Sequence, residues 1–322
     1  MNKKLIALAV AAVASTSVSA AEIFNDGTSS LSIGGRAEAR ASMIDGDVND
    51  ASRVRLNVMG TTQISEEVYG VGFFEREFKS NEGDDENRYI FAGIGSQYGL
   101  VTYGLNDGSL GIITDFTDIM AYHGAAASGK ILVADRTDNN FAYVGEFGGL
   151  TVKANYVFDT SETVGNTKTT KVGGYSAAAT YAMENGVAFG LGYADQGKDT
   201  NEASQVEAAV SYTFGDIYVA ALYNNGEAYN KDHKKVVDVD GYELAAAYSM
   251  GNTTFTTTYG NKEEANEKAA NALAIDATHF FNDNFRAYVS YNFNMLDAEN
   301  GMNAEDKLKT EDELALGLRY DF

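Results

Sequence analysis

The sequence of 322 residues contains no cysteine, no proline and no tryptophan, and basic residues are scarce. Without cysteine an exported chain has no disulfide framework, which excludes a small stapled scaffold. Lys and Arg number 24 against 46 Asp and Glu, a formal net charge of −22. A nucleic-acid partner needs the opposite excess, because its phosphates must be neutralised. DNA and RNA are therefore excluded as partners.

Long apolar runs are also missing beyond the first twenty residues. Residues 1–20 are predicted to be a secretory signal peptide, with basic Lys3 and Lys4, an apolar run and small residues before the cleavage site. Its removal takes two lysines and no acid, so the net charge goes from −22 to −24. No later stretch approaches the roughly 18 apolar residues of a membrane helix. Residues 21–322 are thus expected to form one domain, either a soluble exported protein or a β-barrel, which satisfies its backbone in lipid.

Glycine and aromatic residues are abundant, with 33 Gly, 20 Tyr and 17 Phe, and they suit many strands joined by tight turns. Apolar and polar residues alternate along most of residues 21–322, as in LTVKANYVF at residues 150–158. This period of two is typical of half-buried strands. Very short connections take turns with long polar ones, as in antiparallel strands with one plain end and one elaborated end.

The alternation predicts sixteen strands in an all-β, antiparallel fold. Their approximate ranges are 29–42, 50–62, 66–79, 86–97, 99–106, 139–147, 150–159, 172–183, 187–196, 204–215, 216–226, 238–250, 253–262, 272–282, 283–296 and 311–322. Sixteen strands closed into a transmembrane β-barrel would enclose an aqueous lumen. Aromatic residues at several strand ends suit rings at a bilayer interface, but they would also suit the core of a soluble sandwich.

Early strands carry charged residues at a spacing of two. Arg36, Glu38 and Arg40 share one side of a strand, and Arg53 and Arg55 share one side of the next. In a barrel, an arginine facing lipid near the midplane costs roughly 2 to 4 kcal/mol. These side chains are therefore predicted to face the lumen. Glu75 and Glu77 are plausible lumen residues by the same parity, where they could also pair with wall arginines.

Several ordered segments resemble the general diffusion porins of Gram-negative outer membranes. They are AEIFNDG at residue 21, the pair of strands from Ser52, NRYIFAGI, VTYGLNDG and the ending GLRYDF. The stretch LGIITDFTDIMAYHG is most similar to the Vibrio-type, OmpU-like branch. The resemblance implies a sixteen-stranded homotrimeric barrel whose third loop, about residues 106–137, folds inward. The PEFGGD loop signature of enterobacterial members is absent.

The resemblance also implies a pore constriction. It places Arg36, Arg55, Arg88 and Arg136 on a basic wall, and the loop carboxylates that would face them are Asp115 and Asp118. Glu38, Arg40, Arg53 and Glu75 are expected as further lumen residues. Because arginine keeps its charge at any relevant pH, such a wall would create a permanent transverse field that disfavours apolar solutes. A simpler interpretation is that these charges mainly tether the loop to the wall.

The expected function is passive diffusion of small hydrophilic solutes and ions, with weak cation selectivity caused by acidic loops such as SNEGDDENR. The alternatives are a substrate-selective channel and an outer-membrane interaction or adhesion protein that acts through those loops. The resemblance implies location in the outer membrane, contact with lipopolysaccharide, and an assembly machinery that reads the terminal aromatics Tyr320 and Phe322. No enzyme activity, cofactor or metal is expected. His123, His233 and His279 lack metal-ligand spacing and are interpreted as surface residues without partners.

Overall fold

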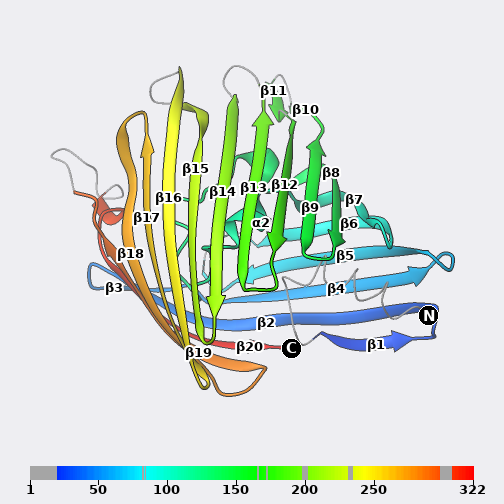
Figure 1. The fold of residues 1–322 in the computed structure, drawn as a ribbon, viewed down its shortest axis with the longest axis horizontal. Helices are drawn as coiled ribbons and strands as arrows, with labels where there is room; N and C mark the ends of the chain where they lie inside the picture. Colours follow the sequence, from blue (N-terminus) through cyan, green and yellow to red (C-terminus); the bar gives the residue numbers. More distant parts are fainter. Residues whose placement is uncertain are drawn as a thin grey trace.

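The computed structural model describes residues 20–322, except 82, 84, 165–166, 172, 198–201, 231–234 and 298–306. The predicted signal peptide, apart from Ala20, and His233 lie outside the described residues. The fold is a closed antiparallel barrel in which each strand pairs with the next barrel strand and the last pairs with the first (Figure 1). The sixteen barrel strands are β2 (Ser29–Ile44), β4 (Arg53–Gln63), β5 (Val68–Lys79), β6 (Glu86–Ser96), β7 (Gly99–Asp107), β8 (Arg136–Phe147), β9 (Leu150–Val157), β12 (Gly174–Ala182), β13 (Val187–Gln196), β14 (Ala203–Phe214), β15 (Ile217–Asn230), β16 (Lys235–Met250), β17 (Thr253–Glu264), β18 (Glu267–Phe280), β19 (Phe285–Asn294) and β20 (Glu313–Asp321). The predicted sixteen-stranded barrel is confirmed.

Four shorter strands were not predicted as separate elements: β1 (Ala21–Asn25), β3 (Asp47–Asp50), β10 (Thr160–Val164) and β11 (Thr167–Lys171). β10 and β11 pair with each other in the connection between β9 and β12, where the sequence predicted a plain polar loop. Six of their ten residues are Thr or Val. Side chains branched at Cβ favour extended backbone, which explains the hairpin.

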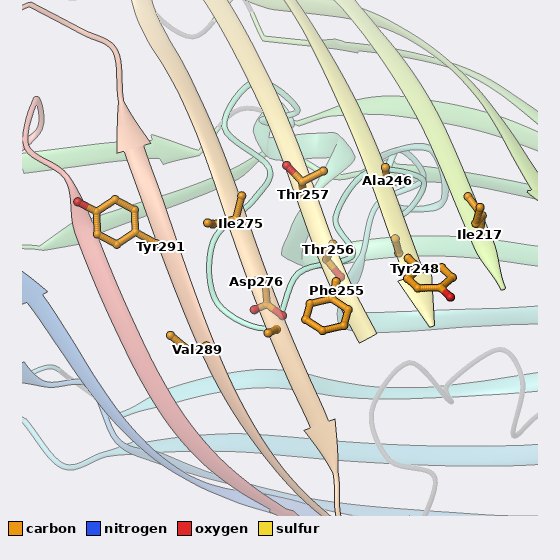
Figure 2. A pocket seen from close by; sticks show the side chains of 12 residues that line it. Ile217, Ala246, Tyr248, Phe255, Thr256, Thr257, Ile275, Asp276, Val289 and Tyr291 are labelled. Carbon is orange, nitrogen blue, oxygen red and sulfur yellow. The ribbon is translucent and has the colours of Figure 1, made fainter. Parts of the chain in front are cut away.

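The two faces of the barrel wall differ in polarity, as β20 shows. Leu316, Leu318 and Tyr320 on its outer face are 41%, 49% and 48% exposed, whereas Asp321 on the inner face is 2% exposed. The outside is therefore apolar and the inside polar, as the alternation predicted. The same rule holds over β15–β19, where Figure 2 shows a shallow outer hollow bordered by aromatic rings such as Phe255.

Aromatic rings near the strand ends lie in pairs on the outer face, beside the long connection after β9 and beside the short turn after β14. The ring centroids are 5.0 Å apart for Tyr156 and Phe158, and 5.1 Å apart for Tyr212 and Phe214. Amphipathic rings at the two ends of an apolar outer band are typical of barrels seated in a bilayer. Among the helices of the described part of the chain, none is long and apolar enough to cross a membrane.

The two ends of the barrel sequence meet on the same strand. The backbone of Phe322 exchanges two hydrogen bonds with Gly35 of β2, at N···O distances of 2.8 and 3.0 Å. Two residues earlier on β2, Ile33 pairs with Ala21, the first residue of β1. β1 thus continues the line of β20 along β2. The chain ends on an aromatic residue that closes the sheet and removes its open edge.

The long connection between β7 and β8 covers residues 108–135, within the predicted 106–137, and it carries a short helix, α2 (Gly111–Thr114), and a 3-10 turn, η1 (Leu132–Ala134). In Figure 1, α2 lies inside the barrel behind β12–β14, and it contacts these three strands. The predicted inward fold of this connection is therefore confirmed. We call it the inserted loop.

Candidate functional site

The inserted loop is seated on the inner wall by an apolar cluster. Its side chains Leu110, Ile113 and Val133 are fully buried. They pack against small wall residues, which are Ala178, Ala194, Ala209, Ala220 and Ala245 together with Val157 and Leu222. Glycines complete this surface, because a Cβ on Gly190 would lie 2.8 Å from Cδ1 of Ile113. The alanine-rich strands of the sequence therefore form the wall surface on which the inserted loop packs.

The far part of the loop is held by one buried carboxylate. Glu243 of β16 is 1% exposed and accepts hydrogen bonds from the backbone N–H groups of Ala127 and Ser128, at 2.6 and 3.0 Å, and from Thr117 Oγ1 at 2.6 Å. Sequence reasoning missed this residue. Its signal was a single acid among apolar residues in YELAAAYSM, on the parity that faces the lumen.

The arginines of the predicted wall lie on the lumen face, and most of them are paired. Arg55 Nε lies 2.5 Å from Glu77, and Arg88 Nε lies 2.8 Å from Glu75. Arg136 forms an ion pair with Glu86 at the start of β6. Glu75 and Glu77 thus face the lumen and also neutralise wall arginines, so both interpretations of these two acids hold.

The first strand contributes Arg36, Glu38 and Arg40. Glu38 is 3% exposed and binds Arg53 at 2.8 Å, while Arg36 Nε is 3.9 Å from the same carboxylate. Arg40 donates from Nε to the carbonyl of Ala51 at 2.8 Å, and its guanidinium lies 5.2 Å from the ring centre of Tyr122 in the inserted loop. Arg40 therefore supports the loop rather than a free passage.

Asp115 and Asp118 project from the inserted loop into the lumen. With Arg55, Arg88 and Arg136 they line one cavity of about 480 Å³, and Arg36 lines an adjoining cavity that also includes Asp118. Within the described residues neither aspartate forms an ion pair. The arrangement brings paired arginines on the wall to face unpaired carboxylates on the loop across water.

Asp115 lies in the inserted loop, outside the strands that form the barrel. Although its side chain reaches lumen water, the enclosing wall removes part of its solvation and raises its pKa to about 6, and the neighbouring charge of Asp118 adds to the shift. A nearby amine, Lys130, acts in the opposite direction. Asp115 thus changes its charge close to neutral pH.

A family model described as Gram-negative porin matches residues 7–299 of the chain. The chain belongs to this family. Across its full length this porin is 50% identical to Outer membrane protein U of Vibrio parahaemolyticus and 48% identical to Porin-like protein L of Photobacterium profundum, and each alignment also covers all of the relative. It is therefore a channel of the outer membrane that serves passive diffusion, and its relatives are not enzymes.

Solved porin structures share the fold. A Salmonella typhi OmpF structure in complex with daunomycin is 22% identical and matches with a TM-score of 0.80, covering 94% of this chain and 100% of the other. The trimer form of OmpT from Vibrio cholerae is 18% identical and matches with a TM-score of 0.71, covering 92% and 100%. At these identities the likeness supports the barrel fold alone.

The interpretation of the histidines as surface residues without partners was wrong for His123 of this porin, which is largely buried. His279 is exposed as predicted, but it does have a partner. His123 of the inserted loop places Nδ1 2.8 Å from Ser290 Oγ and Nε2 3.3 Å from Glu313, so it fastens the loop to β19 and β20. His279 lies 2.9 Å from Thr253 Oγ1 on the neighbouring strand. Parity could not reveal partners from distant strands. No group of three or more His, Cys, Asp or Glu side chains that could hold a metal occurs in the described part of the chain.

Proposed function

We propose that this porin is a weakly cation-selective channel whose constriction lies between the inserted loop and the arginine wall. The residues involved are Arg36, Arg55, Arg88 and Arg136 on the wall and Asp115 and Asp118 on the loop. The observation that carries the proposal is that the wall arginines form ion pairs and the loop aspartates do not, within the described residues. Wall arginines are largely neutralised by carboxylates at about 3 Å, whereas the loop aspartates have no ion pair within the described residues. The acidic loops add to the preference, because the whole sequence has a net charge of −22.

The test is a reversal potential measured across a planar bilayer with a potassium chloride gradient. Wild type should prefer potassium over chloride. Replacing the two loop acids by Asp115→Asn with Asp118→Asn should reduce the permeability ratio about twofold or more and change the conductance, because two unpaired charges leave the narrow region. Asp138→Asn on β8, an exposed acid of the same type outside the cavity, is the matched control. Anion preference in wild type, or an unchanged double variant, would contradict the assignment.

The pH dependence of the cation preference is a second prediction for the same site. Because the pKa of Asp115 is raised to about 6, its carboxylate is charged above that pH and loses the charge as the pH falls through it. Cation preference should therefore weaken between pH 7.5 and pH 5, where exposed carboxyl groups with ordinary pKa values near 4 remain charged. Reversal potentials across this range should show the change in wild type and a flatter profile in Asp115→Asn. An equal pH response in both proteins would exclude Asp115 as its source.

We further propose that the porin assembles as a homotrimer in contact with lipopolysaccharide, after cleavage of residues 1–20. The trimer form of the OmpT structure supports the oligomeric state. So does an outer hollow of about 520 Å³ beside Ala37 and Ala39, where small side chains of β2 would let another copy pack closely. The outer-membrane assembly machinery is proposed to recognise Tyr320 and Phe322, whose rings stack 6.1 Å apart at the end of the chain.

A further inference from the structure

A group of arginines that overlaps the wall at Arg36 and Arg55 lies on the lumen face where β19, β20, β2, β4 and β5 run side by side. We call it the rim patch, and its members are Arg36, Arg53, Arg55, Arg286 and Arg319 with the acids Glu38, Glu77 and Asp321. Five arginines against three carboxylates leave two positive charges in excess. Arg286 follows the short turn before β19 by one residue, so the patch begins at the short-turn end, which faces the periplasm in barrels of this kind.

Like charges are direct neighbours in this patch. Arg286 is the register partner of Arg319, and Arg36 is the register partner of Arg55. Side chains directly opposite each other on adjacent strands lie about 5 Å apart at Cβ, and like charges there are destabilising. Two such pairs on four joined strands need negative charge beyond what the wall supplies.

The available carboxylates are already shared. Asp321 binds Arg286 Nη2 at 2.7 Å through one oxygen and Arg319 Nη2 at 2.6 Å through the other. Glu38 binds Arg53 at 2.8 Å and leaves Arg36 at 3.9 Å. Arg36 Nε is buried and has no hydrogen-bond partner within the described residues. Because a guanidinium has five N–H donors, most donors of Arg36, Arg286 and Arg319 remain available.

Apart from the buried Nε of Arg36, the guanidinium groups border a cavity of the lumen. The side chains of Arg36, Arg319 and Arg286 keep 14%, 20% and 24% of their surface exposed. They line a cavity of about 540 Å³ whose other charged members are three arginines and only two carboxylates, Glu38 and Asp118. The cavity is large enough for a small hydrated anion, and its charge attracts one.

We infer that the rim patch binds a tetrahedral oxyanion, of the class of inorganic phosphate, between Arg36, Arg286 and Arg319. Planar guanidinium groups bind oxyanions through paired N–H donors, which a spherical chloride ion cannot match. A dianion would cancel the two excess charges and relieve both arginine pairs. Because arginine stays charged at all relevant pH values, the site is present whenever the barrel is folded.

The bound anion alters permeation, and this part of the inference rests on the proposed cation-selective pore. A rim patch without a bound anion repels cations and attracts chloride at the periplasmic end of the lumen. An occupied patch is close to neutral, so the loop acids determine selectivity. Phosphate should therefore make the channel more cation-selective, although phosphate is itself an anion.

The experiment measures reversal potentials in a potassium chloride gradient at pH 7.5. It compares solutions with and without about 10 mM potassium phosphate at constant ionic strength. In wild type, phosphate should raise the potassium-to-chloride permeability ratio about twofold. The increase should disappear in Arg319→Gln, which removes one arm of the site. Arg76→Gln is the control, because Arg76 pairs with Asp85 at 3.5 Å away from the lumen cavities, and this variant should respond like wild type.

Direct binding separates this inference from the proposed function. Saturable broadening of the phosphorus NMR signal of phosphate by detergent-purified porin should occur in wild type and Arg76→Gln and be lost in Arg319→Gln. A conducting channel with no phosphate effect, or with the same effect in Arg319→Gln, would overturn the oxyanion site and leave the pore intact. A silent bilayer would refute the pore, and the NMR result alone would then decide the site.

Discussion

Replacing Gly192 by valine should lift the inserted loop from the wall and raise single-channel conductance by about half or more, because a wider passage carries more ions. Gly192 lies on the lumen face of β13, where an added Cβ would overlap Cδ2 of Leu110 and lie 3.3 Å from Cγ1 of Ile113. Both loop side chains are fully buried and cannot turn away. Overpacking of this kind costs about 1 to 3 kcal/mol. The barrel keeps its strand pairing, so the loop is the part that moves.

The matched control for this prediction is Ala246→Val, which adds bulk to the outer face of β16, beside the hollow in Figure 2, and should leave conductance unchanged. Loop displacement can be measured separately by the entry of larger sugars into liposomes. If Gly192→Val formed channels of wild-type conductance and size exclusion, the apolar contact between the inserted loop and the wall would not be what holds the loop in place. Low yield with normal channels would give the same answer, since it would place the damage in assembly.

Deleting Phe322 should reduce the amount of assembled porin about tenfold or more, and the pores that do form should conduct normally. The deletion removes both backbone hydrogen bonds with Gly35, each worth about 0.5 to 1.5 kcal/mol, and the ring that stacks on Tyr320. A loss of 1.4 kcal/mol is already a tenfold change in an equilibrium. The closing edge between β20 and β2 is thereby weakened, and the proposed assembly signal is lost. The lumen charges are untouched, so conductance should not change.

Phe214→Ala is the control for the terminal aromatic. Phe214 stacks on Tyr212 at another strand end on the outer face, 5.1 Å between ring centres, and has no role in closure. Assembled protein in outer-membrane fractions and single-channel conductance should be compared for both variants. An equal loss of assembly in both variants would show that any aromatic ring at a strand end on the outer face matters to the same degree. Altered conductance with normal assembly would remove the assembly role of Phe322.

Strand-level features could be predicted from the sequence because they depend on local alternation. The period of two determines which side of each strand is apolar, and it correctly placed Arg36, Glu38 and Arg40 inside. The number of strands followed from the same pattern, whereas closure into a membrane barrel was implied by the family resemblance, because alternation suits a soluble sandwich as well. The hairpin β10–β11 was missed, since its polar threonines resemble a loop in composition although their branching favours strands.

Pairing between distant strands was decided only by the tertiary structure. Three contacts join residues more than a hundred positions apart: Glu243 with the inserted loop, His123 with Ser290 and Glu313, and Arg36 with the pair Arg286 and Arg319. Alternation states which face a side chain takes, but not which side chain from another strand it meets, because barrel curvature and the path of the loop set that distance. The sequence by itself thus determined a porin barrel with a charged lumen. Only the folded barrel decided which of those charges are paired and which remain free to act on passing ions.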